Sequence, residues 1–292
     1  MKDSKHPPLR KTSQHAEKSL KCCVCDTNKH ETFYKEINNY ELVRCKGCGL
    51  VYLKSEDNDI NFINDAQNDL HSSEKEKIEY WSFPDYYENY KMVFELFFED
   101  RLRKIKEFSP KPESMLDIGC GYGFWMKYCK ENGLSVHGID PSQETVDWAV
   151  RDYDLNAERT IIEEFVTDKS YDIIVLCDVL EHLRNPLLQL ERINGFLKHD
   201  GILYIQVPNL LGFKLPFRHG FGSPHHIWQF SIQPLTKLLK KSGFTVVKYH
   251  TGVQGVIGAY ERGGPSVKEL TTWWMARTFK IGNRLQVIAR KD

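Results

Sequence analysis

Apolar and polar positions follow two different periods in the second half of the chain. From about Glu113 onward, short apolar runs alternate with segments in which apolar residues recur every three or four positions, the spacing of one helix face. The runs predict strands at 114–118, 135–139, 173–176, 202–207, 245–250 and 285–290, with a weaker one at 157–160. The periodic segments predict helices that include 124–132, 186–197 and 234–241. This alternation indicates an α/β fold with an open parallel sheet covered by helices on both faces.

The last predicted strand differs from the others. Residues 251–280 contain Trp273 and Trp274 but show no helical period, so no crossover helix is visible before 285–290. We therefore expect this strand to run antiparallel at the edge of the sheet.

The region before the sheet divides by composition. Residues 1–20 hold too few apolar groups to order themselves and predict a disordered tail, whereas 54–78 are polar and acidic, as in a linker. Apolar positions from Tyr90 to Ile105 recur at helical spacing. The expected regions are a tail at 1–20, a cysteine module at 21–53, a linker and helical lid at 54–111, and the main domain at 112–292.

Length and charge narrow the classes of function. The 292 residues include 40 basic and 40 acidic side chains, so the formal net charge is zero and no global field favours nucleic acid or an anionic membrane. No stretch approaches the roughly 20 apolar residues of a membrane span, and Met1 to Lys21 lacks the apolar core of a secretory signal. We expect a cytoplasmic protein that binds neither nucleic acid nor a membrane. Its oligomeric state stays open.

Four of the eight cysteines form two Cys-x-x-Cys pairs, Cys22 with Cys25 and Cys45 with Cys48. In a reducing compartment such pairs indicate metal ligands rather than disulfides, and their spacing is that of zinc sites. Four thiolates make a closed structural Zn²⁺ site with no position left for catalysis. Cys23 is not expected to be a ligand, because the usual knuckle needs two intervening residues.

The most informative segment joins the first predicted strand to the helix after it. Gly119, Gly121 and Gly123 form a loop in which glycine allows positive φ and a close approach of the backbone to a ligand. Such loops also occur in dinucleotide sites and plain turns. Here Asp140 ends the second strand, where a carboxylate can accept both ribose hydroxyls of a nucleoside. Asp117 precedes the glycines and is placed to receive a charged amino group, which fits a pyrophosphate site less well.

Three motifs, in order, resemble the class I S-adenosylmethionine-dependent methyltransferases. They are Asp117-Ile118-Gly119-Cys120-Gly121-Tyr122-Gly123, Gly138-Ile139-Asp140-Pro141-Ser142 and the stretch 171–183, and the resemblance covers roughly residues 80–292. It implies a Rossmann-like seven-stranded sheet whose last strand is antiparallel, with S-adenosylmethionine as cofactor. It places the methionine part on Asp117 and the glycine loop, ribose on Asp140, and adenine near Ile161. The residues that it implies for the cofactor are Asp117, Gly119, Cys120, Gly121, Gly123, Asp140, Pro141, Ile161, Glu163, Asp178 and Val179.

Histidines are the candidates for proton transfer. His182 follows the fourth strand at the carboxyl edge, where ligands of open α/β folds bind, and it is either a proton acceptor or, with Glu181, a group that orients the loop. His225 and His226 lie in the loop 223–231, and an oxygen or carbon acceptor needs a base. Ser231 is expected to cap the next helix.

Two further features concern the acceptor. Tyr86, Tyr87 and Tyr90 are candidates for a lid over the substrate or, equally, for helix packing. The stretch 44–52 also resembles the zinc-binding module that precedes some bacterial small-molecule methyltransferases, including ones that act on nucleotide-linked sugars. We therefore expect methyl transfer to a small molecule, with a nucleotide-linked sugar or glycan precursor as the leading class. The alternatives are an RNA or protein methyltransferase that uses the zinc ribbon for recognition, and a non-catalytic cofactor-binding protein.

Overall fold

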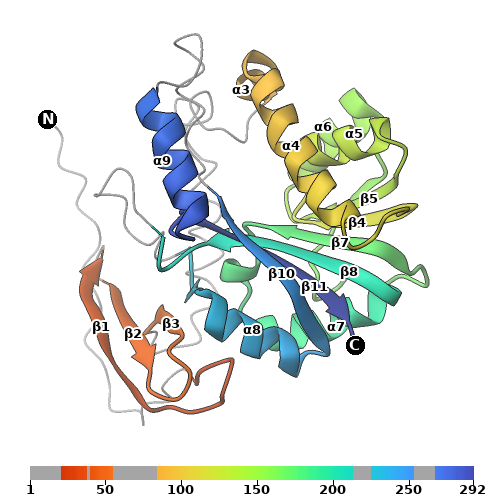
Figure 1. The fold of residues 1–292 in the computed structure, drawn as a ribbon. Coiled ribbons are helices and arrows are strands. Elements are labelled where there is room, and N and C mark those ends of the chain that lie inside the picture. Colours follow the sequence, from red (N-terminus) through yellow and green to blue (C-terminus); the bar gives the residue numbers. More distant parts are fainter. Residues whose placement is uncertain (1–20, 38–39, 55–83, 213–224, 253–266) are drawn as a thin grey trace, which may run out of the picture.

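The computed structural model describes residues 21–37, 40–54, 84–212, 225–252 and 267–292 (Figure 1). The predicted tail at 1–20 and most of the predicted linker, 55–83, lie outside them. No helix in the described part of the chain is long and apolar enough to cross a membrane.

Seven of the described strands form one mixed sheet in the order β10-β11-β8-β7-β4-β5-β6, which confirms the predicted fold class. Its strands are β4 (Ser114–Ile118), β5 (Ser135–Asp140), β6 (Ala157–Arg159), β7 (Tyr171–Cys177), β8 (Leu197–Pro208), β10 (Phe244–Gly252) and β11 (Arg284–Lys291). The five strands from β8 to β6 pair in parallel, each strand of the sequence prediction is present, and the weak one corresponds to β6.

The last strand is antiparallel, as predicted, but its predicted edge position was wrong. β11 lies between β10 and β8 and pairs antiparallel with both. Val287, Ile288 and Ala289 are buried in succession, so both faces of this strand are covered. A strand buried on both faces belongs inside a sheet, and β10 takes the edge instead.

The expected absence of a helix before β11 was also wrong, because α9 (Val267–Thr278) occupies part of that segment. Among the α9 side chains whose burial is described, Ala276 is buried and the others are exposed. The described side chains of α9 therefore show no buried stripe that would make a helical period visible in the sequence.

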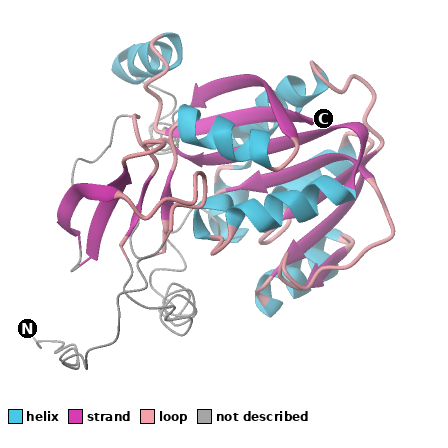
Figure 2. Ribbon diagram, turned by 90° about the horizontal axis from the view of Figure 1, so that it is seen from below, coloured by secondary structure: helices cyan, strands magenta, loops and turns pink. Residues whose placement is uncertain are grey.

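Helices cover both faces of the seven-stranded sheet (Figure 2). They are α3 (Pro84–Asn89), α4 (Lys91–Lys106), α5 (Phe124–Glu131), α6 (Gln143–Tyr153), α7 (Pro186–Phe196) and α8 (Ile232–Lys241). Alternate residues of β7 show how the faces separate. Ile173 and Val175 join the apolar cluster under α4 and α5, while Ile174 and Leu176 join the cluster under α7 and α8.

The cysteine module forms a second, smaller sheet, drawn in orange in Figure 1. Its strands are β1 (His30–Ile37), β2 (Tyr40–Cys45), β3 (Val51–Leu53) and β9 (Trp228–Gln229), in the order β1-β2-β3-β9 and with antiparallel pairing. β9 comes from the main domain, far along the chain. The module is therefore joined to the main domain by strand pairing and not by the linker alone.

Candidate functional site

Three loops meet at the carboxyl edge of the parallel strands, where ligands of open α/β sheets bind. They follow β4, β5 and β7, which are neighbours in the sheet. Gly119 after β4 lies directly against Val179 after β7, because a Cβ on Gly119 would come within 2.4 Å of the Val179 Cγ2 atom. Two of the three sequence motifs are thus in contact.

The glycine loop has the backbone conformation that its sequence predicts. Gly119, Gly121 and Gly123 have φ of 77°, 53° and 79°, a region that side chains with a Cβ rarely adopt. The Gly119 and Cys120 N–H groups both donate to the Ile139 carbonyl, which ties the loop to β5. Apart from its chain neighbours, no described atom lies within 4 Å of the position of a Cβ on Gly121. That side of the loop offers bare backbone to a ligand.

Asp140 organises the start of the next helix. Its Oδ2 atom accepts a hydrogen bond from the Gly121 N–H at 2.9 Å, and its Oδ1 atom accepts from the Ser142 N–H at 2.9 Å and the Thr145 hydroxyl at 3.0 Å. Ser142 caps α6 by accepting from the Thr145 N–H. A carboxylate offers about four lone-pair sites, so this one retains capacity for a further donor.

Asp117 is buried at the end of β4, with 4 % of its surface exposed. Burial raises the pKa of Asp117 to about 7, the Arg101 guanidinium opposes that shift, and Asp140 adds to it. Arg101 comes from α4 and lies 4.8 Å from the ring centroid of Trp125. Nothing in the sequence points to Arg101, because an arginine on a helix gives no signal that its charge acts on an acid of a distant strand.

The residues expected around adenine lie in a turn after β6. Ile161 and Glu163 are exposed, Ile162 between them is buried in the core, and the Ile161 carbonyl accepts from Glu164 and Phe165. Pro141 is exposed beside this turn, and its carbonyl accepts from the Arg159 guanidinium at 3.2 Å.

Asp178, directly after β7, is held by two side chains that the sequence analysis did not identify. Its Oδ1 atom lies 3.1 Å from the Arg284 Nε atom in an ion pair, and its Oδ2 atom accepts from the Gln206 amide at 3.1 Å. Its φ of 56° turns the chain sharply away from the sheet. Arg284 starts β11 and Gln206 lies in β8, so only the sheet order brings them here.

The turn Leu180–His182 and the segment that begins at His225 are joined by backbone and ring contacts. The Ile227 N–H donates to the Glu181 carbonyl at 2.9 Å, and the His182 Nδ1–H donates to the His225 carbonyl at 2.8 Å. The rings of His182 and His226 meet edge to face, with centroids 4.8 Å apart. The structure therefore brings His182, His225 and His226 together, as the sequence could not show. Residues 223 and 224 of the predicted loop lie outside the described residues.

The Glu181 carboxyl group lies near His182 and His226. Its side chain is fully buried, and neither oxygen has a hydrogen-bond partner among the described residues. Burial and the neighbouring Asp178 raise the pKa of Glu181 well above its usual range, and burial lowers the pKa of His182. The signal available in the sequence was that Glu181 directly precedes a candidate histidine, His182.

The three tyrosines do not share one environment. Tyr87 is 1 % exposed and stacks on Phe124 at the start of α5, with centroids 4.1 Å apart. Tyr86 and Tyr90 are half-buried and contact each other, with centroids 4.6 Å apart. Tyr87 is thus a packing residue of the helical layer, and its stack holds α3 against the helix that follows the glycine loop.

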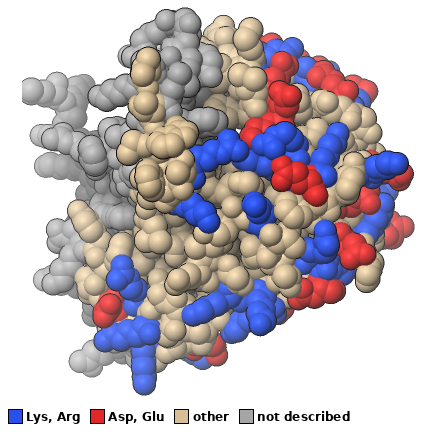
Figure 3. Space-filling view, viewed as in Figure 1, with Lys and Arg blue, Asp and Glu red and all other residues tan. Residues whose placement is uncertain are grey.

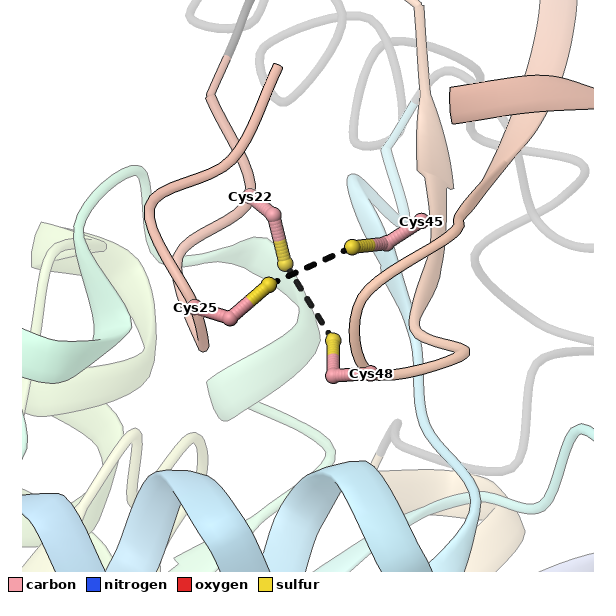
Figure 4. Close-up of side chains that lie close together, drawn as sticks. All are labelled: Cys22, Cys25, Cys45 and Cys48. Atoms are coloured by element: carbon pink, nitrogen blue, oxygen red, sulfur yellow. Dashed lines mark hydrogen bonds between the residues drawn. The ribbon is translucent and has the colours of Figure 1, made fainter. Parts of the chain in front are cut away.

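The four predicted cysteine ligands converge (Figure 4). The Sγ atoms of Cys22 and Cys48 are 3.4 Å apart, those of Cys25 and Cys45 are 3.3 Å apart, and all four lie within 4.8 Å of one another. Zn–S bonds of about 2.3 Å in a tetrahedron place sulfur atoms about 3.8 Å apart, so the arrangement fits that geometry. Cys23 is not part of this group.

The two cysteine loops have the same backbone pattern, although their sequences differ. The Cys22 N–H donates to the Thr27 carbonyl, and the Cys22 carbonyl accepts from the Asp26 N–H. In the same way, the Cys45 N–H donates to the Leu50 carbonyl, and the Cys45 carbonyl accepts from the Gly49 N–H. Asp26 and Gly49 both have positive φ. A pair of equivalent turns aims four thiols at one point.

Ser231 occupies the N-cap position of α8, as predicted, but its side chain makes no capping hydrogen bond. The helix is held instead by its apolar face, because Leu235, Leu238 and Leu239 are fully buried.

Comparison with known proteins gives a family match to the main domain. The family described as "Methyltransferase domain" matches residues 89–249, which is more than half of the chain. The ubiquinone biosynthesis O-methyltransferase of Actinobacillus pleuropneumoniae serotype 7 (strain AP76) is 30% identical over 108 residues, which cover 33% of this chain and 46% of that protein. A probable (S)-tetrahydroprotoberberine N-methyltransferase of Papaver bracteatum is 26% identical over 101 residues, covering 32% of this chain and 28% of that protein. The matched region thus spans less than half the length of these relatives.

Solved structures share the fold. The plantazolicin methyltransferase BpumL in complex with SAH has a TM-score of 0.51 at 18% identity, and the match covers 79% of this chain and 99% of that one. A possible histamine N-methyltransferase from Thermotoga maritima has a TM-score of 0.51 at 17% identity, with coverage of 73% and 98%.

Proposed function

The chain belongs to the methyltransferase-domain family that matches residues 89–249, and we propose that it transfers a methyl group from S-adenosylmethionine to a small molecule. The observation that carries the proposal is the corner where the loops after β4, β5 and β7 meet. Two buried carboxylates, Asp117 and Asp140, lie there with the glycine loop, in which the backbone of Gly121 is uncovered. This combination suits a ligand with a cationic end and a ribose.

Each cofactor residue has a role that follows from its position. Asp140 accepts from the ribose hydroxyls while it holds the Gly121 N–H, so the same carboxylate shapes the loop and binds the ligand. Asp117 receives the amino group of the methionine part. The exposed side chain of Ile161 covers the adenine face. S-adenosylmethionine supplies the methyl group on a sulfonium, which makes transfer an in-line displacement that depends on alignment.

We place the acceptor beside His182, His225 and His226. Val179 lies against Gly119 on the cofactor side, and Glu181 and His182 follow two and three residues later. An acceptor at this position faces imidazole groups from two segments, and proton removal by such a group typically contributes about 10²–10⁴-fold.

The acceptor class is a small molecule, and the cysteine module makes a nucleotide-linked sugar or glycan precursor the first candidate. The relatives described above include an O-methyltransferase and an N-methyltransferase named for small molecules. Basic and acidic side chains are interspersed on the side that carries α3 to α6 (Figure 3), which does not favour a polyanion on that side.

The cysteine module holds one structural Zn²⁺ through Cys22, Cys25, Cys45 and Cys48. The separations of the sulfur atoms fit a tetrahedral site, and the Gly47 N–H donates to the Cys45 Sγ atom at 3.3 Å, which supports a thiolate there. Four protein ligands close the site, so the ion stabilises the module and takes no part in transfer.

A methyl-transfer assay over nucleotide sugars, other small hydroxyl and amine compounds, and short RNAs tests the proposal. Methylation of a small molecule with SAH as the product supports it. Methylation of RNA alone, or SAH binding with no transfer to any acceptor, rejects it.

The histidines are tested one at a time, with His199→Ala as the control. The His199 side chain is exposed and lies near the start of β8, at the opposite edge of the sheet from the site. If His225 or His226 takes the acceptor proton, its Ala variant keeps SAH affinity and loses turnover by about 10²–10⁴-fold. Near-normal turnover in both variants moves that role to His182.

A further inference from the structure

We propose that Glu181, His182 and His226 bind a divalent transition-metal ion beside the acceptor, at a site separate from the four cysteines. One ligand atom from each of the three residues lies within 4.8 Å of the others. Two imidazoles and one carboxylate are a ligand set that suits Zn²⁺, Fe²⁺, Co²⁺ and Mn²⁺. The inference rests on the proposed function for its placement next to the acceptor. It leaves His225 as the histidine that takes the acceptor proton, because His182 and His226 are ligands.

The first observation that points to a cation is the Glu181 carboxyl group. It is fully buried, and both of its oxygens lack a hydrogen-bond donor among the described residues. A buried carboxylate without a partner carries a large free-energy cost, so it needs a proton or a cation. The Arg284 guanidinium pairs with Asp178 and donates no hydrogen bond to either Glu181 oxygen.

The second observation is the tautomer of His182. A backbone carbonyl can only accept, so the contact with the His225 carbonyl at 2.8 Å means that His182 carries its proton on Nδ1. Nε2 then presents a lone pair. Metal-binding histidines have this arrangement, with one nitrogen on the ion and the other donating to a backbone carbonyl or carboxylate.

The backbone around the three ligands is fixed before any ion arrives. The Ile227 N–H donates to the Glu181 carbonyl, and the Trp228 indole donates to the Leu183 carbonyl at 2.6 Å. These bonds join the turn Leu180–His182 to the segment 225–228. Ligands on a metal with bonds of about 2.1 Å stand roughly 3 Å apart, so the side chains need to close by about 1–2 Å.

Three protein ligands leave coordination positions open, in contrast to the closed cysteine site. Because the three ligands lie beside the acceptor, an open coordination position would take an oxygen of the acceptor. The ion would then lower the free energy of the deprotonated acceptor. The site therefore favours acceptors that methylate on oxygen, or on an atom next to an oxygen donor.

Metal binding is measured without cofactor or acceptor. One equivalent of Zn²⁺ is added first to fill the four-cysteine site, because thiolates select Zn²⁺. Mn²⁺ is then titrated into this protein, and its binding is followed by the loss of the EPR signal of free Mn²⁺. The wild type should bind one Mn²⁺ per chain. Glu181→Gln and His226→Ala should weaken that binding by at least about tenfold, the scale for loss of a supporting group. The exposed-site controls Glu164→Gln and His199→Ala should bind Mn²⁺ as the wild type does.

Thermal melting separates loss of the site from loss of the fold. Glu181→Gln replaces a buried carboxyl group without a partner by a neutral group of the same shape, so its metal-free melting temperature should equal or exceed that of the wild type. Mn²⁺ should raise the melting temperature of the wild type and leave that of the variant unchanged. Equal Mn²⁺ affinity in the folded variant and the wild type, or no Mn²⁺ bound by the wild type, overturns the inference.

These outcomes are distinct from those of the proposed function. A protein that binds SAH and methylates a small molecule, but binds no Mn²⁺ through Glu181, loses this inference alone. A protein that binds Mn²⁺ through Glu181 but neither binds SAH nor transfers methyl loses the proposed function alone.

Discussion

In the proposed cofactor site, Asp140 would link the fold to the ligand. It holds three donors of its own chain, from Gly121, Ser142 and Thr145, and these contacts fix the glycine loop against the start of α6. A ribose would add donors to oxygens whose positions are already set. This preorganisation reduces the entropy lost on binding.

Asp140→Ala is expected to raise the Kd for SAH by about 10- to 100-fold, because two ribose hydroxyls lose their acceptor at about 1–3 kcal/mol. Calorimetry gives the affinity, and far-UV circular dichroism checks that the sheet is intact. Asp147→Ala is the matched control, since this acid of α6 accepts from Gln143 in the preceding turn of the same helix. Unchanged SAH affinity in Asp140→Ala would remove the ribose assignment.

Asp117 should make the affinity for SAH depend on pH. Its pKa of about 7 in the ligand-free protein, raised by burial against the opposing Arg101 charge, means that it is half protonated near neutrality. Only the carboxylate pairs with a charged amino group, so SAH affinity should rise with pH from 5.5 to 8 and fall by up to about tenfold per unit below pH 7.

Calorimetry in two buffers of different ionisation enthalpy should also show proton release when SAH binds near pH 6.5. Asp117→Asn should bind weakly at every pH and show no such slope. A wild-type affinity that is constant between pH 5.5 and 8 would contradict the assignment of the amino group to Asp117.

At the scale of elements, β9 connects the cysteine module to the segment that carries His225 and His226, where we place the acceptor. Tyr52 and Val51 of β3 pair with Trp228 and Gln229 of β9, and the Leu53 N–H donates to the Ile227 carbonyl. The same short segment carries His225 and His226. The module therefore supports the loop that faces the acceptor, in addition to any contact of its own with a partner.

If the four cysteines hold one Zn²⁺ as proposed, Cys45→Ser should lose it. With the module weakened, β9 loses its neighbour and the histidines shift, so turnover should fall by up to about 100-fold, the cost of a misplacement near 1 Å. SAH affinity should stay near the wild-type value, because the glycine loop and Asp140 lie on the other strands of the large sheet.

Cys23→Ser is the matched control, since Cys23 is adjacent to a ligand and outside the cluster of four. It should keep both zinc and turnover. Full zinc content in Cys45→Ser would reject the ligand set, and normal turnover in a zinc-free variant would reject the support role of β9.

At the scale of the molecule, the sequence predicted what depends on local pattern. β4, β5 and β7 carry their own signal, because strands buried on both faces show as short continuous apolar runs. The glycine loop does so because only glycine takes φ near 77° readily. The insertion of β11 between β10 and β8 and the approach of Arg284 to Asp178 depend on contacts between segments far apart in the sequence. Arg101 beside Asp117 and the burial of the Glu181 carboxyl group were hidden for the same reason.

The two sheets share one apolar core, although the sequence suggested separate modules. A single cluster of buried side chains runs from Leu42 and Leu50 of the cysteine module, through Trp228 of β9, to Ile174 and Leu203 in the large sheet. Separating the two sheets would expose apolar surface on both sides of this cluster, at a cost of about 25 cal/mol for each Å². The module is therefore held to the main domain by its packing as well as by the pairing of β3 with β9.

A shared core predicts that the cysteine module and the main domain unfold together. Calorimetry should show one transition with equal calorimetric and van't Hoff enthalpies, because neither sheet can expose its side of the common cluster without exposing the other. If SAH binds the main domain and Zn²⁺ binds the module, as proposed, each should raise the temperature of that same transition. A chelator should lower it by several degrees with SAH present or absent, since 1 kcal/mol corresponds to roughly 2–4 °C for a protein of this size. Two separate transitions, with the chelator moving one and SAH the other, would show that the module folds on its own and that β9 does not couple it to the acceptor corner.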